Sequence, residues 1–363
     1  MTLAQWSNLL VYAAMGVYAL AFISFAVSFA ATRNSGDGAP TPGPEPMAQP
    51  VEVQLASVGS AGSAAPDAAA QARAAARTTS AQVEAQMAAE ARRGGRRAGR
   101  SGGSGATPDE LPPGRQAANI AMSLTWLAFG LLLAGLIVRG LWAGRAPWGN
   151  MYEYSLASAV AITGVFLGVS IRRDVRWLGL LVTMASLITL GVAVLLLYND
   201  SPQLVPALKS YWLVIHVSAA IISGGAFTVG AAATILYLVA DRAERNPDAR
   251  LAHSIAARVP DSRSLDTLAY KVNAFVFPLW TFAVIAGAIW AEDAWGRYWG
   301  WDPKETWAFI TWLVYAAYLH ARATAGWKGR RAAMIALLGF ACFLINFFGV
   351  NLFAGGLHSY AGV

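Results

Sequence analysis

The chain is poor in charge, in cysteine and in histidine for its 363 residues. Asp, Glu, Lys and Arg make up 13% of the sequence, whereas hydrophobic residues make up 56% and the mean hydropathy is +0.45. So little charge excludes an ordinary soluble enzyme, in which about 25% of residues are charged. The single cysteine, Cys342, excludes an intrachain disulfide, a CxxC redox pair and a thiolate zinc site. Any thiol chemistry must therefore use the thiols of a partner.

The sequence contains long apolar runs without charged residues. The first run covers residues 3–31, and seven more follow at 116–138, 154–171, 177–199, 210–240, 272–291, 306–321 and 332–363. Each is long enough, or nearly so, to cross about 30 Å of hydrocarbon as a helix. We therefore expect an all-α, polytopic membrane bundle with about eight transmembrane helices.

The basic residues predict how the bundle is oriented. The first run has no basic residue before it and Arg33 after it, which is the reverse of a cleavable signal peptide, so we expect a retained helix with its N-terminus outside. This orientation puts 22 of the 27 Lys and Arg on the cytoplasmic side, and the short loops alone favour it by 13 to 5. Both termini are then on the outer side. Basic residues distributed in this way argue against a nucleic-acid partner.

Residues 32–116 differ in composition from the rest of the chain. They contain no Phe, Trp or Tyr and nine of the sixteen prolines, together with much Ala, Gly and Arg. A segment of this kind cannot bury a core, so we expect a cytoplasmic linker that is largely disordered. The sequence thus divides into a transmembrane helix at 1–31, the linker at 32–116 and a membrane domain at 117–363.

Tryptophan is concentrated in one predicted outer connection, where six of the 14 lie between residues 290 and 312. An aromatic belt at the membrane interface accounts for those on the flanking helices, Trp290, Trp307 and Trp312. The other three share one short, glycine-spaced loop: Trp295, Trp299 and Trp301. A belt does not require this spacing, and a flat aromatic platform for a large planar ligand explains it better.

Three of the four histidines lie in or beside apolar runs, where titratable groups are costly and tend to be functional. His216 is placed roughly 10 Å into its span from the outer end, and His358 follows the last span on the same side. Two neutral imidazoles at similar depth can ligate a haem iron. His320 is placed roughly 21 Å from Thr306 toward the cytoplasm, so it either bonds across helices or needs a ligand partner from elsewhere. His253 is most simply a solvated loop residue.

Acidic residues near the tryptophans have alternative interpretations. Asp302 precedes Pro303 and can cap a helix there, or it can orient a ligand histidine as carboxylates beside metal-bound imidazoles do. Glu305 suits the N-terminus of the same helix. Glu153 is expected to pair with Arg145 in an outer loop.

These residues resemble a known family. The string WGRYWGWDPKETW at 295–307, continuing to Leu-His-Ala-Arg at 319–322, closely resembles the WWD signature of the CcsA/ResC proteins of cytochrome c biogenesis. Further matches are PWGNMYE at 147–153, PALKSYWLVIH at 206–216 and NFFGVN at 346–351. The WWD element alone is shared with the CcmC and CcmF haem proteins, whereas the longer run to Leu-His is similar to CcsA/ResC. The resemblance covers about residues 120–363.

The resemblance implies roles for individual residues. His216 and His358 match the external axial ligands of exported haem b, and His320 matches an intramembrane haem ligand whose counterpart lies on a ResB/CcsB-like subunit. The external WWD loop, placed at 292–305, presents the haem. Its members in this sequence are Trp295, Trp299, Trp301 and Asp302. The outer cations available for the haem propionates are Arg297, Lys304 and Arg145.

The resemblance also implies a function. The chain is expected to be the haem-transporting part of a cytochrome c synthase of the haem lyase type, acting with a ResB-like partner in the bacterial plasma membrane. It would move haem b outward and present it externally for thioether attachment to CxxCH apocytochromes, with thioredoxin-like proteins keeping thiols reduced. The alternatives are a CcmC-like haem chaperone without ligation activity, a b-type electron-transfer protein and, less favoured, a solute transporter.

Overall fold

The computed structural model describes residues 1–34, 114–199 and 210–358. Within them the chain is helical and contains no strand. Most of the predicted linker, residues 35–113, lies outside the described residues. The linker boundaries predicted at 32 and 116 are wrong by a few residues, because the flanking helices continue to Asn34 and begin at Arg115.

From α3 to α5 and from α6 onward, the long helices are joined by short connections or shorter helices. In chain order the elements are α1 (Leu3–Asn34), α3 (Arg115–Ala143), α4 (Met151–Ser170), a 3-10 turn (Arg176–Leu178), α5 (Gly179–Leu196), α6 (Tyr211–Arg245), α7 (Arg250–Ala256), α8 (Ser262–Trp295), α9 (Pro303–Ala323), α10 (Arg330–Leu344), a π-helix (Ile345–Gly349) and α11 (Val350–Phe353).

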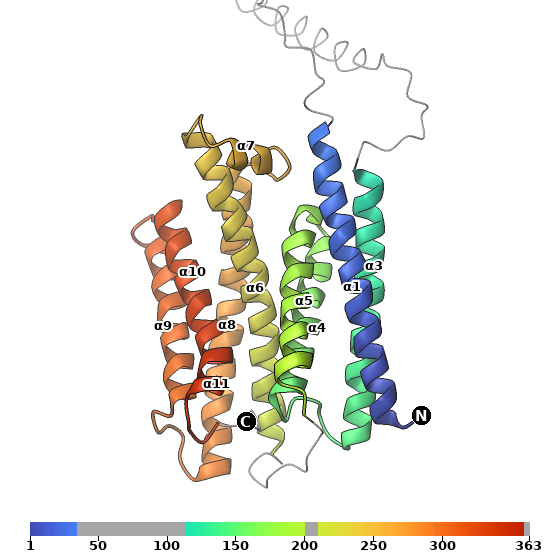
Figure 1. Ribbon diagram of the computed structural model, residues 1–363. Helices are drawn as coiled ribbons and strands as arrows, with labels where there is room; N and C mark the ends of the chain where they lie inside the picture. Colours follow the sequence, from blue (N-terminus) through green and yellow to red (C-terminus); the bar gives the residue numbers. More distant parts are fainter. Residues whose placement is uncertain (35–113, 200–209, 359–363) are drawn as a thin grey trace, which may run out of the picture. The chain divides into compact units, whose positions relative to one another are not determined.

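Consecutive long helices run in opposite directions, so the connections gather at two ends of the bundle (Figure 1). At one end, called here the α7 end, lie α7, the connection from α9 to α10, the last residues of α1 and the first of α3. At the other, called the α11 end, lie the α3–α4 and α8–α9 connections and the segment after α11. Within the described ranges, the segments predicted to share the cytoplasmic side therefore lie at the α7 end, and those predicted to be external lie at the α11 end.

Among the described residues, seven helices are long and apolar enough to cross a membrane, which makes the chain a multi-pass membrane protein. The predicted span 306–321 forms most of α9, but α9 is not among the seven and carries polar residues near both of its ends. The count of eight and the orientation of the termini stay predictions. The last predicted span, 332–363, is too long, because helix ends at Phe353, just before Gly355 and Gly356.

Helix α6 forms the centre of the bundle and packs against α4, α8 and α10. Glycines allow this close approach. A Cβ atom at Gly225 would lie 2.6 Å from the backbone of Ala161 in α4, and one at Gly230 would lie 2.7 Å from Asn273 in α8. A Cβ at Gly224 would overlap the ring of Phe343 in α10. Small residues at helix interfaces are how membrane helices maximise van der Waals contact.

Candidate functional site

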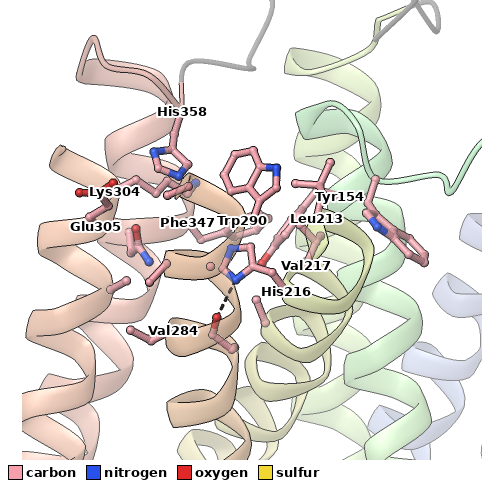
Figure 2. A pocket seen from close by; sticks show the side chains of 18 of the residues that line it. Tyr154, Leu213, His216, Val217, Val284, Trp290, Lys304, Glu305, Phe347 and His358 are labelled. Carbon is pink, nitrogen blue, oxygen red and sulfur yellow. Dashed lines mark hydrogen bonds between the residues drawn. The ribbon is translucent and has the colours of Figure 1, made fainter. Parts of the chain in front are cut away.

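A cavity of about 130 Å³ lies at the α11 end between α4, α6, α8, α9 and the π-helix. Two of the predicted ligands, His216 and His358, line it together although they are far apart in sequence. Figure 2 shows Lys304 and Glu305 on one side, Tyr154 on the other, and His216 and Trp290 between them. We call this cavity the pocket.

The ring of His216 is fixed by α8. Its Nδ1 lies 2.7 Å from the backbone oxygen of Ala283, and since a carbonyl only accepts, Nδ1–H is the donor. The neutral ring then keeps its lone pair on Nε2. Gly287, one turn further along α8, leaves room for the ring, because a Cβ there would lie 2.7 Å from it. The indole of Trp290 stacks parallel to the imidazole, with ring centroids 6.2 Å apart.

His358 is held by Asp302 after the last helix has ended. Its Nδ1 donates to Asp302 Oδ1 at 2.9 Å, so Nε2 is again the nitrogen that carries the lone pair. Asp302 also accepts from the backbone N–H groups of Lys304 at 3.0 Å and Leu357 at 2.8 Å. Both interpretations of Asp302 therefore hold in the structure: it caps α9, and it orients a histidine.

Burial favours the protonated form of the Asp302 carboxyl, but its contacts outweigh burial. Hydrogen bonds from His358 and from the backbone N–H groups of Lys304 and Leu357 lower its pKa from 3.8 to about 2. Asp302 is thus ionised at neutral pH. The charged carboxylate stabilises the Nδ1–H tautomer of His358.

Glu305 closes the capping box that starts α9, as predicted for its helix N-terminal position. It accepts from the backbone N–H of Asp302 at 3.2 Å and of Gly300 at 2.8 Å, and it pairs with Arg297 at 3.0 Å. The guanidinium of Arg297 in turn lies over the ring of Trp295. These contacts fold the loop back onto α9, while the predicted role of Arg297 toward haem stays a prediction.

The loop between α8 and α9 is shorter than predicted. Helix α8 continues to Trp295 and ends at Gly296, whose φ of 66° is the left-handed conformation common at helix C-termini. The predicted loop, 292–305, is therefore reduced to residues 296–302. Trp301 has a φ of 58°, the one positive value among the described residues other than glycine, and such strain clusters at functional sites.

The three loop tryptophans do not form the flat platform that their spacing suggested. Trp295 points inward, with ring centroids 4.7 Å from both Trp290 and His358. Trp299 lines the pocket, and its ring is nearly perpendicular to that of Trp301, at 88°. Edge-to-face contacts of this kind are favoured by the aromatic quadrupole. Trp301 is 66% exposed beside Trp299, which lines the pocket.

Trp290 was missed as a site residue and interpreted as part of an aromatic belt. Its side chain is 1% exposed and touches both histidines, so it cannot face lipid headgroups. One signal was available in the sequence. Gly287 precedes Trp290 by three residues, and residues three apart share one face of a helix.

His320 lies on α9 away from this pocket, as its position in the sequence predicted. Its side chain is exposed on the helix surface. Two residues later, Arg322 forms a two-pronged ion pair with Asp266 of α8, with distances of 2.7 and 2.9 Å. His253 is exposed in α7, at the α7 end.

A buried ion cluster supports the side of the pocket formed by α4. Glu153 is fully buried and pairs with Arg145 at 2.6 Å, as predicted, and also with Arg139 at 3.1 Å. It accepts a third bond from the backbone N–H of Gly149 at 2.9 Å. The orientation predicted from the basic residues puts Arg139 in an outer connection, but Arg139 is 1% exposed, because Glu153 and the backbone oxygen of Asn199 satisfy it. The cluster fixes residues 145–153 as a unit.

Lys304 differs from the other two predicted cations. Arg297 and Arg145 are paired with Glu305 and Glu153, whereas Lys304 forms none of the salt bridges among the described residues. Burial lowers the pKa of Lys304 to about 7, although nearby Asp302 partly opposes this. The amine lines the pocket.

Unsatisfied polar atoms are concentrated at the pocket. In the described part of the chain, six buried side-chain nitrogen or oxygen atoms make no hydrogen bond. Four of the six belong to residues that line the pocket: Trp148 (Nε1), Asn150 (Nδ2), Trp280 (Nε1) and Asn346 (Oδ1). Asn346 lies in the π-helix, an element that is frequent at functional sites. Buried polar groups without partners are rare and need an explanation.

Comparison with known proteins places this arrangement among relatives. A family model described as "Cytochrome C assembly protein" matches residues 148–358. The "Cytochrome c biogenesis protein CcsA" of Microcystis aeruginosa is 36% identical over 304 residues, covering 71% of this chain and 91% of the relative. That of Guillardia theta is 40% identical over 237 residues, covering 61% and 79%.

One solved structure, "Cytochrome c Heme Lyase CcmF", superposes with a TM-score of 0.56 at 15% identity. The match covers 96% of this chain and 47% of the CcmF chain, so this protein spans about half the length of the CcmF chain. At this level of identity the likeness shows a shared fold.

Proposed function

Because the chain belongs to the CcsA family of cytochrome c biogenesis proteins, we propose that its pocket at the α11 end holds haem b between His216 and His358 for thioether attachment to CxxCH apocytochromes. The pocket would face the outside of the bacterial plasma membrane. A ResB/CcsB-like subunit and thiol-reducing, thioredoxin-like proteins would act with it. Haem is the substrate of this reaction and not a resident cofactor.

The observation that carries the proposal is the pair of histidines. Each ring donates through Nδ1 to a fixed acceptor, Ala283 oxygen for His216 and the Asp302 carboxylate for His358. In each neutral ring Nε2 is then the nitrogen with the lone pair, which is the state required of an axial haem ligand. The donor set of the pocket therefore fits a haem iron.

The remaining residues of the pocket have positioning roles. Trp290 and Trp295 pack against the histidines and keep water from them. The exposed Trp301 would contact the arriving apocytochrome. Bound haem supplies the vinyl groups to which the two cysteine thiols add. Holding the reactants together in the correct orientation supplies most of the rate enhancement. Release follows when the histidine of the CxxCH segment replaces one of this chain's ligands.

His320 suits an inner haem site shared with a partner. Its exposed side chain on α9 can be reached by a second subunit, which would supply the other ligand. Haem would then pass from this site outward to the pocket. A b-type electron-transfer protein is less favoured, because such proteins usually pair histidines within their own spans.

The proposal is tested by the visible absorption and pyridine haemochrome spectra of the purified chain, expressed with and without a ResB-like partner. We expect bound b-type haem, and conversion of a co-expressed CxxCH apocytochrome to the c-type spectrum when the partner is present. Haem-free protein under every condition would refute the proposal. Haem binding without conversion would favour a haem chaperone.

Substitution of Gly287 by Ala is expected to weaken haem binding about tenfold. The new methyl group would lie 2.7 Å from the His216 ring and displace it from the Ala283 oxygen, and overpacking of this size costs about 1–3 kcal/mol. Titration of the Soret band measures the affinity. Gly168→Ala is the matched control, since a Cβ there meets nothing within 4 Å. Equal affinities for the two variants would contradict the assigned position of His216.

Substitution of Asp302 by Asn is expected to lower haem affinity by about 10- to 100-fold, the usual cost of losing a carboxylate behind a metal-bound histidine. Asn still caps helices well, so α9 should keep its start. Asp261→Asn is the control, because Asp261 caps α8 at the α7 end, far from the pocket. If both variants bound haem like the parent protein, Asp302 would be only a helix cap.

A further inference from the structure

The start of α4 forms a polar wall of the pocket that the two-histidine site does not use. Trp148, Gly149, Asn150 and Met151 all line the pocket, and they are called here the α4 wall. The wall belongs to the string PWGNMYE, for which the proposed function gives no role. Its position is fixed from behind by the buried ion cluster around Glu153.

Asn150 has its acceptor occupied and its donor unused. Oδ1 accepts from the backbone N–H of Glu153 at 2.8 Å, which is the N-cap of α4. This contact identifies the other amide atom as Nδ2, because only an oxygen can accept there. Nδ2 has no hydrogen-bond partner, and the residue is only 5% exposed. The indole N–H of Trp148 is also buried without a partner. Two fixed donors thus lack an acceptor.

The charge around the α4 wall favours an anion. Two guanidinium groups, those of Arg139 and Arg145, pair with Glu153 behind the wall. The N-terminus of α4, a helix of 20 residues, adds the positive end of its dipole and backbone N–H groups. Among the residues that line the pocket the acidic one is Glu305, which is paired with Arg297.

We infer that the α4 wall is a carboxylate-binding subsite, in which the side-chain N–H groups of Asn150 and Trp148 bind a propionate of the haem substrate. The inference rests on the proposed function, since haem b carries two propionates. Two unused donors beside a helix N-terminus favour an acceptor with negative charge. The subsite fixes which edge of the haem faces α4 and thereby orients the vinyl edge.

The test compares two ligands on the purified full-length chain: protohaem, and protohaem dimethyl ester, in which both carboxylates are blocked. Soret titrations give the affinity of each. The variants are Asn150→Asp, which keeps the cap acceptor but replaces the N–H donor by an oxygen, and Asn150→Ser, which keeps the cap acceptor and replaces the amide N–H by a shorter hydroxyl. Asn246→Asp, in an exposed position at the C-terminal end of α6, is the control.

We expect the parent chain and the control to prefer protohaem to the ester. Both Asn150 variants should lose about tenfold in affinity for protohaem and little for the ester, because a hydrogen bond to a charged group is lost only with the acid. Equal losses for both ligands would show a structural role and overturn the subsite. So would unchanged affinities. If the parent chain bound neither ligand, the proposed function itself would fail.

Discussion

His216→Ala and His358→Ala are each expected to abolish the formation of c-type cytochromes and to remove most of the bound haem. Each substitution deletes one of the two nitrogens that face the iron in the proposed site, and no other histidine lines the pocket. The protein should still insert, because insertion depends on the apolar spans, which neither substitution interrupts. Cytochrome assembly in cells and the haemochrome of the purified variants measure the effect.

His253→Ala is the matched control, since His253 is exposed in α7 at the opposite end of the bundle. It should assemble cytochromes as the parent does. Added imidazole should partly restore haem binding to His216→Ala and His358→Ala, because it supplies the missing nitrogen. Normal assembly in either variant would remove that histidine from the site. Loss of haem that imidazole cannot restore would instead indicate damage to the fold.

Glu153→Gln is expected to lower the free energy of unfolding by about 3–5 kcal/mol, the cost of leaving a buried charge without its partner. Arg139 is 1% exposed and would keep its charge beside a neutral amide. Thermal unfolding of the detergent-solubilised protein measures the change. Glu292→Gln, at an exposed glutamate near the end of α8, should have almost no effect.

A second variant separates charge from shape at the same cluster. Replacement of both Arg139 and Glu153 by Met removes the most deeply buried ion pair as a unit, an exchange that is often neutral for stability, and leaves only the more exposed Arg145 without its partner. The double variant should therefore unfold at a higher temperature than Glu153→Gln. The reverse order would mean that Glu153 acts through its hydrogen bond to Gly149 rather than through its charge.

The bundle could be predicted from the sequence because membrane spans are encoded locally, by runs of apolar residues. The same reasoning is weaker for α9, whose ends carry Lys304, Glu305 and Arg322 and whose composition is less apolar. Helix boundaries were missed by a few residues, since α8 continues past the first charged residues, Glu292 and Asp293, until Gly296 ends it. Composition does not encode such boundaries.

The candidate site was predicted in part. Depth along the helices placed His216 and His358 on one side of the bundle, and both line one pocket. What could not be predicted are contacts between distant segments, such as Asp302 with Leu357 and His358. The burial of Trp290 and Arg139 was also missed, because tryptophan and arginine near the end of a span usually lie at the membrane surface. Only the packing of neighbouring helices shows that these two face inward.

The glycines of α6 have a mechanical consequence. Three neighbouring helices contact the backbone of α6 so closely that it has no room to tilt or rotate. The side of the pocket that carries His216 is therefore rigid. His358 belongs to residues 354–358, and Trp299 and Trp301 belong to residues 296–302. Asp302 connects these two segments by hydrogen bonds to Leu357 and His358. The side of the pocket that carries His358 is therefore the more flexible one. The loops therefore adjust to the size or tilt of a bound ligand, while the position of His216 stays fixed.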